Sequence, residues 1–111
     1  MTMTVSWKRQ LRENGFIEVG GFRIELTLEN TFMDIDYIPR IAVFWEEDGR
    51  WHVLRNSIPK GRTLEEGWDN AVKLLEKIVA GEEKPMFDDP SVERAFLETL
   101  RVLISDDFKI R

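Results

Sequence analysis

The stretch FIEVGGFRIELTL, residues 16–28, shows the clearest structural pattern in the chain. Its second half alternates apolar and polar residues, the period of two that is typical of a strand with one buried face. Gly20-Gly21 joins this strand to the run before it, and two glycines suit a tight hairpin because both turn positions can require a positive φ. The hairpin has two expected facing pairs: Val19 with Phe22, and Ile17 with Ile24.

Residues 41–47 and 50–55 predict a third and a fourth strand, because Asp48-Gly49 between them is a strong hairpin signal. A two-residue turn there would place Trp45 opposite His52. Residues 29–37, rich in turn formers and acids, are expected to connect the two hairpins.

The second hairpin carries large apolar groups on both of its predicted faces. On one face the predicted register pairs Val43 with Leu54, and on the other it pairs Phe44 with Val53. Trp45 and Trp51 fall on opposite faces, so one tryptophan is exposed unless both faces are covered. An exposed tryptophan is a frequent anchor at protein interfaces.

Three helices are predicted from their end signals. A short one runs to Asn14 after a Ser6 or Thr4 cap, and Gly15 stops it. A second starts at the capping box Thr63-Leu64-Glu65-Glu66 and ends at Gly81, and a third starts at Asp89-Pro90. The predicted fold is a single α+β domain over residues 1–111. It is a four-stranded antiparallel meander of two hairpins, with the short N-terminal helix and the two C-terminal helices packed on one face.

The composition indicates an ordinary globular protein. The 111 residues are 42% hydrophobic and 33% charged, with a net charge of −5. The longest apolar run, residues 41–45, is far shorter than the ~20 residues of a membrane helix. With no cysteine, disulfides and thiolate chemistry are excluded, and with no signal-peptide pattern at the N-terminus we expect a cytoplasmic protein without membrane contact.

Catalytic chemistry finds little support in the sequence. His52 is the single histidine, and no serine stands in a Gly-x-Ser-x-Gly motif. Three acid pairs could in principle hold Mg²⁺ in a small metal-dependent hydrolase: Asp34 with Asp36, Asp88 with Asp89, and Asp106 with Asp107. Such a site needs acids that converge from rigid elements. The first pair is expected in a loop, the second at a helix cap and the third beyond the final helix, so the pairs are not expected to converge. We therefore expect no catalytic residue, no cofactor and no metal.

Residues 41–81 resemble the HicB-like antitoxin domain. The resemblance lies in the Asp48-Gly49 hairpin, a proline loop, and Gly61-Arg62-Thr63-Leu64-Glu65-Glu66 leading into a helix with Asn70-Ala71. It implies a partial ribonuclease-H-like fold that lacks the catalytic acids and neutralises a small RNA-cleaving toxin by binding it. The chain departs from the family at Gly67, where alanine is usual, in its short loop 56–60, and in having no evident DNA-binding motif in its last helix.

The function predicted from these features is a non-catalytic binding module. It would be an acidic inhibitor, antitoxin-like protein or assembly subunit that binds a protein partner, with self-association as a further possibility. The alternative is a nucleic-acid-binding domain whose sheet offers aromatics for stacking and arginines for phosphate. In that model Arg55 and Arg40 share the face of Trp51. The candidate binding residues are Trp45, Trp51, His52, Arg40, Arg50, Arg55 and Arg62.

Overall fold

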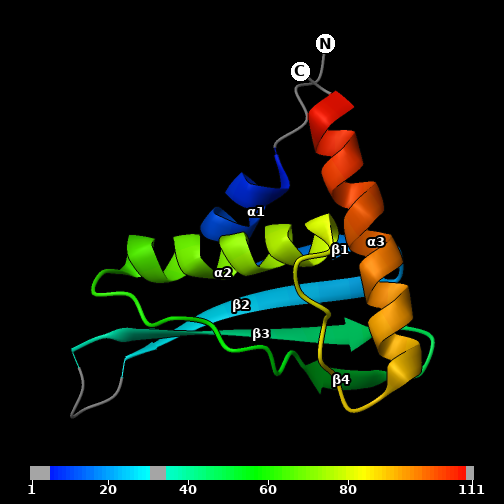
Figure 1. Cartoon of the computed structure of the whole chain (residues 1–111), viewed down its shortest axis with the longest axis horizontal. Coiled ribbons are helices and arrows are strands. Elements are labelled where there is room, and N and C mark those ends of the chain that lie inside the picture. The colour runs from blue at the N-terminus through cyan, green and yellow to red at the C-terminus, as the bar shows by residue number, and fades with distance from the viewer. Residues whose placement is uncertain (1–5, 31–34, 110–111) are drawn as a thin grey trace.

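A computed structural model describes residues 6–30 and 35–109, with side chains described up to residue 103. The element order is α1 (Trp7–Asn14), β1 (Phe16–Val19), β2 (Phe22–Asn30), β3 (Tyr37–Trp45), β4 (Arg50–Val53), α2 (Leu64–Ala80) and α3 (Pro90–Lys109). The strands form one antiparallel sheet in the order β1-β2-β3-β4. This is the predicted α+β meander, and the number and order of the helices are also as predicted (Figure 1).

The first hairpin has the predicted register. Val19 pairs with Phe22 and Ile17 pairs with Ile24. Both turn glycines have positive φ, 53° and 80°, which is the backbone conformation that the two-residue turn needs.

The second hairpin has a register two residues away from the predicted one, and this expectation was wrong. Trp45 pairs with Arg50, and His52 lies opposite Val43 instead of Trp45. The turn has four residues, 46–49, because only Gly49 has a positive φ and a two-residue type I′ turn requires it at both positions. A shift of two residues keeps each side chain on its predicted face.

The strand ends also differ from the predicted ones. β2 and β3 are nine residues each, so the connection between them is shorter than predicted. β4 stops at Val53, so Arg55 is not part of the sheet; its N–H donates to the carbonyl of Met86 at 2.8 Å.

The helix ends follow the predicted chemistry. The Ser6 hydroxyl accepts from the N–H of Arg9, and Thr63 Oγ1 accepts from the N–H of Glu66 at 3.0 Å. Asp89 Oδ1 accepts from the N–H of Ser91 at 2.8 Å, at the start of α3. No helix within the described residues is long and apolar enough to cross a membrane.

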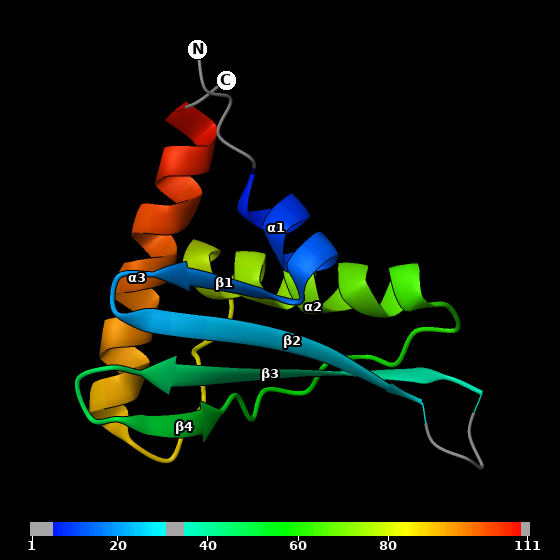
Figure 2. The ribbon, with the colours of Figure 1, turned by 180° about the vertical axis from the view of Figure 1, so that it is seen from behind.

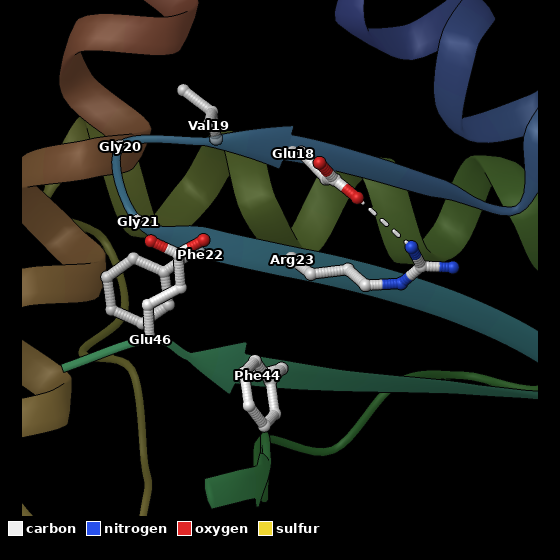
Figure 3. A pocket seen from close by; sticks show the side chains of 8 residues that line it. All are labelled: Glu18, Val19, Gly20, Gly21, Phe22, Arg23, Phe44 and Glu46. Atoms are coloured by element: carbon white, nitrogen blue, oxygen red, sulfur yellow. Dashed lines mark hydrogen bonds and ion pairs between the residues drawn. The ribbon is translucent and has the colours of Figure 1, made fainter. Parts of the chain in front are cut away.

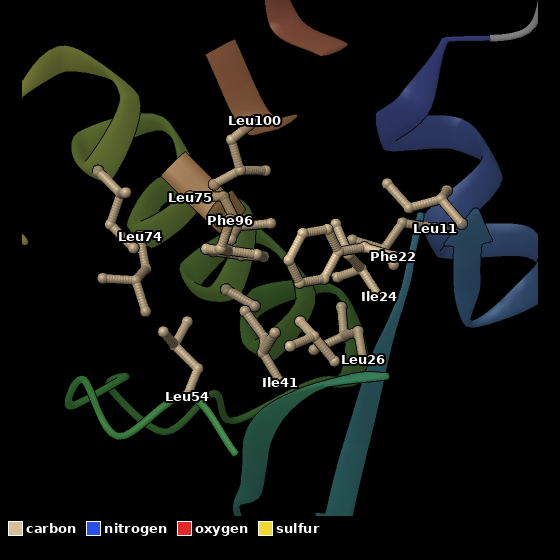
Figure 4. Close-up of a cluster of buried hydrophobic side chains, with 14 of the residues drawn as sticks. Leu11, Phe22, Ile24, Leu26, Ile41, Leu54, Leu74, Leu75, Phe96 and Leu100 are labelled. Atoms are coloured by element: carbon tan, nitrogen blue, oxygen red, sulfur yellow. The ribbon is translucent and has the colours of Figure 1, made fainter. Parts of the chain in front are cut away.

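The core lies between one face of the sheet and the helices (Figure 4). From the sheet it takes Phe22, Ile24, Leu26, Ile41 and Val43, and α1 adds Trp7 and Leu11. α2 contributes Ala71, Val72, Leu74, Leu75 and Ile78, and α3 contributes Val92, Phe96 and Leu100. Figure 2, seen from behind, shows the sheet in front and α2 and α3 behind it.

Candidate functional site

The two faces of the sheet have different surroundings. One face packs on the core, and no described helix covers the other, which we call the open face. Because strand residues alternate between faces, the pairing register fixes its members. The open face consists of Phe16, Glu18, Arg23, Glu25, Thr27, Glu29, Ile38, Arg40, Ala42, Phe44, Trp51 and Val53.

Apart from Arg40, the half of the open face on β3 and β4 is apolar. Trp51 is 50% exposed and Val53 is 57% exposed, which is unusual for side chains of this size and type. The Trp51 ring lies 5.5 Å from the ring of Phe44, its cross-strand neighbour. Ala42 lies opposite Val53 and extends the apolar surface along the strands. Such a patch can bury a partner's apolar side chain without any change in fold.

The half on β1 and β2 is charged but internally paired. The guanidinium of Arg23 donates to Glu25 at 2.8 Å and to Glu18 at 3.1 Å. It also lies 3.8 Å from the centre of the Phe16 ring. The hydrogen bond to Glu25 is the main cause that raises the pKa of Arg23 above its ordinary value; desolvation opposes it, and Glu18 adds to it. Arg23 is thus a cation that this face already holds between carboxylates and an aromatic ring.

A hollow of about 340 Å³ opens beside the turn between β1 and β2. Figure 3 shows the carboxylates of Glu18 and Glu46 at its border and the ring of Phe44 among its lining. The N–H of Glu46 donates to the carbonyl of Gly21 at 2.9 Å, which fixes the start of the β3–β4 turn beside this hairpin. The two turn glycines contribute only backbone to the lining, and the Thr99 side chain of α3 packs close to Gly20.

The two candidate tryptophans have different places. Trp45 lies on the covered side, stacked on Phe22 with ring centres 5.7 Å apart, and packs against the core. Trp51 is the exposed member of the pair. The sequence left open whether both faces of the second hairpin are covered; Trp51 lies on the face that no described helix covers.

The candidate arginines do not gather around Trp51. Arg40 is on the open face but pairs with Glu29 at 3.1 Å, about 13 Å along the strand from the row of Trp51 at ~3.3 Å per residue. Arg50 pairs in register with Trp45. The predicted register placed Arg55 on the sheet face of Trp51. Instead, its guanidinium pairs with the carboxylate of Asp88 at 3.1 Å.

Arg62 lies at the other end of the sheet. It follows Gly61, whose backbone pairs with Tyr37 at the start of β3. Tyr37 is seven residues from Phe44, or about 23 Å along the strand. The basic rim expected around Trp51 is therefore not assembled.

The His52 side chain lies between the β3–β4 turn and the edge of the core. Its Nε2 lies 2.8 Å from Asp48 Oδ2, and its ring meets Phe87 edge-on. Asp48 also accepts from the N–H of Arg50 at 2.9 Å. Desolvation raises the pKa of Asp48, but the hydrogen bonds from Arg50 and His52 and their charges outweigh it, so this pKa lies below its ordinary value. These contacts stabilise the four-residue turn.

The described members of the acid pairs on the loop before α3 are engaged within the fold. Asp88 pairs with Arg55, and Asp89 caps α3. Asp34 lies outside the described residues. Asp106 and Asp107 were expected beyond the last helix, but α3 continues to Lys109, and their side chains are not among those described. Within the described residues, no group of three or more potential metal ligands is found.

Most of the open face was not among the predicted binding residues; Phe16, Arg23, Phe44 and Val53 matter most for the site. The sequence holds a signal for them, since the alternation in residues 16–28 places Arg23 on the face opposite the core. What it lacks is the alignment of β2 with β3, which joins Arg23 and Phe44 as direct neighbours. That alignment depends on a connection whose turn formers make up no two-residue hairpin motif that would fix a register.

Comparison with known proteins gives no relative: no family model matches the chain, and neither the curated proteins nor the solved structures give a significant match.

Proposed function

We propose that this chain is a non-catalytic binding module that binds a protein partner through its open face. The observation that carries the proposal is the exposed pair Trp51 and Val53 beside Phe44, on a sheet face without a covering helix. Exposed apolar surface is unfavourable in water. A partner that covers these side chains therefore gains about 25 cal/mol for each Å² of apolar surface removed from water. Tryptophan is enriched among the residues that dominate interface energies.

A protein partner suits this face better than a nucleic acid. The cation nearest the apolar half, Arg23, is already paired with Glu18 and Glu25. Phosphate contacts need unpaired cations, and nucleic-acid affinity depends mainly on their number. The net charge of −5 adds a general repulsion toward polyanions and favours a partner of opposite charge.

An inhibitor, an antitoxin or an assembly subunit would each act in this way. The resemblance of residues 41–81 to HicB-like antitoxins supports the second of these. The departure at Gly67 has a packing reason: a Cβ there would lie 2.9 Å from Leu28 Cδ2, and one at Gly61 would lie 2.1 Å from the Gly67 nitrogen. A cytoplasmic location belongs to the same proposal, and cell fractionation tests it.

The test is capture of partners from the native host with tagged chain, comparing wild type with Trp51→Glu. Leu64→Glu is the matched control, because Leu64 is 55% exposed and lies at the start of α2, away from the open face. We expect Trp51→Glu to weaken capture of a stoichiometric partner by about 30-fold, the factor of a 2 kcal/mol hot spot, and Leu64→Glu to leave it unchanged. Equal capture by both variants would refute the proposal.

The exposed Trp51 ring, in tilted contact with Phe44, also fits the nucleic-acid alternative, in which bases stack on exposed aromatics. A shift assay with labelled single-stranded DNA and RNA at low salt separates the two. We expect no shift. A salt-dependent shift that Trp51→Glu abolishes would favour the alternative instead.

A further inference from the structure

We propose that the hollow beside the β1–β2 turn receives an arginine side chain of the protein partner. The inference rests on the proposed function, because it names the chemistry by which the partner is recognised next to the apolar patch. The hollow and the patch share Phe44, which lines the hollow and touches Trp51. A partner seated on Trp51 therefore has this hollow within reach.

The size of the hollow fits one long side chain. Its volume of about 340 Å³ lies at the small end of the range for ligand sites, roughly 300–1,000 Å³. Gly20 and Gly21 form one wall as bare backbone. A partner residue must therefore be long enough to pass the turn and reach the carboxylates.

The charges around the hollow favour a cation. The lining carries two carboxylates, those of Glu18 and Glu46, and one guanidinium, that of Arg23, so one negative charge of the lining remains uncompensated. Arg23 is moreover shared between Glu18 and Glu25, and Glu25 lies outside the lining. Within the described residues the carboxylate of Glu46 makes no hydrogen bond and no ion pair. It can accept from a guest without giving up a contact in the fold.

Arginine suits the hollow better than lysine because a planar guanidinium can stack on a ring while it donates to carboxylates at its edge. The same face already shows this arrangement once: Arg23 lies over the Phe16 ring and donates to Glu18 and Glu25. In the hollow, Phe44 would take the place of the ring, and Glu46 and Glu18 the place of the carboxylates.

The experiment titrates the isotope-labelled chain with the blocked tripeptide acetyl-Gly-Arg-Gly-amide and follows backbone amide shifts by NMR. The control peptide carries citrulline, which has nearly the same shape as arginine but no charge. We expect weak, saturable shifts at Gly20, Gly21 and Phe44 with arginine only. Equal shifts with citrulline, or shifts confined to other parts of the chain, would overturn the inference.

A pair of neighbouring variants sharpens the test. Glu46→Gln should weaken arginine binding about three- to fivefold, the effect of an exposed charge pair. Glu47→Gln, the next residue in the same turn and not part of the lining, should leave it unchanged. The same loss in both variants would mean only a general field effect and would contradict a defined site.

Failure here and failure of the proposed function give different results. If Trp51→Glu abolishes partner capture while the arginine peptide causes no shift, the binding module stands and the arginine site falls. If the peptide binds at Gly20 and Gly21 while Trp51→Glu captures as well as wild type, the site stands and the binding role of the apolar patch falls.

Discussion

The two faces of the sheet are built from the same strands but differ in what they contribute. On the covered face, Ile24, Ile41 and Val43 are completely buried. On the open face, Trp51 and Val53 of β4 keep half or more of their surface in water. The difference teaches that stability and binding can be changed separately in this chain. Substitutions on the covered side should alter the fold, and those on the open side should alter the partner.

The largest effect should come from the covered side. Phe96 is fully buried and meets the rings of Phe22 and Phe87 edge-on. Phe96→Ala removes these contacts and leaves a cavity, so we expect a loss of about 3–5 kcal/mol in the free energy of unfolding. Urea denaturation followed by far-UV circular dichroism measures it. A loss under about 1 kcal/mol would mean that α3 does not pack on the sheet as described.

A smaller loss should follow from Gly61→Ala, at the place where the loop before α2 meets the helix. The new Cβ would lie 2.1 Å from the backbone nitrogen of Gly67, so backbone has to move, at a cost of about 2–3 kcal/mol. Gly49→Ala is the control, because it meets nothing within 4 Å and costs only about 1 kcal/mol for its φ of 65°. Thermal or urea unfolding of both should rank Gly61 first; the reverse order would contradict the close approach of loop and helix.

Thr63→Ala should cost about 1 kcal/mol, because the first turn of α2 loses its cap. Thr27→Ala makes the same chemical change on the open face, where the side chain is exposed and surface changes stay within about 0.5 kcal/mol. Parallel urea titrations compare the two. Equal losses in the two variants would contradict the stabilising role of the Thr63 cap.

The smallest effect should depend on pH. The pKa of Asp48 lies below its ordinary value of 3.8 in the folded chain, so the ionised carboxylate stabilises the fold fully above that value. This contribution disappears as the pH falls through the lower, folded pKa. Asp48→Asn should therefore be less stable than wild type near neutral pH, and the gap should close below about pH 4. A gap that stays constant in urea titrations down to about pH 3 would contradict the role of the carboxylate.

The two hairpins show how far sequence reasoning reaches. Gly20-Gly21 allows positive φ at both turn positions, so the turn and the register of β1 with β2 followed from the residues themselves. At Asp48-Gly49 the same reasoning failed, because Asp48 serves as a hydrogen-bond acceptor for Arg50 and His52 and only the glycine adopts a positive φ. The faces were predicted correctly even so, since the register error was an even number of residues.

The site was predictable only in part. Alternation placed Trp45 and Trp51 on opposite faces, but it could not say whether both faces are covered. The predicted grouping of arginines near Trp51 was wrong. Residues close in sequence need not lie close on the sheet: β4 ends at Val53, so Arg55 leaves the sheet and pairs with Asp88. Contacts between distant loops were invisible as well: Asn56 is buried and hydrogen-bonds to Glu83, Lys84 and Met86, 27–30 residues away, and nothing in the local sequence indicates it.

Hydroxyl-radical footprinting of the tryptophans, free and with the captured partner, tests the central claim most directly. In the free chain Trp51, half exposed, should be oxidised much faster than Trp7, which is 3% exposed. In the complex Trp51 should be protected, while Trp7 stays slow in both states. Oxidation of Trp51 at the same rate with and without the partner would contradict binding through the open face.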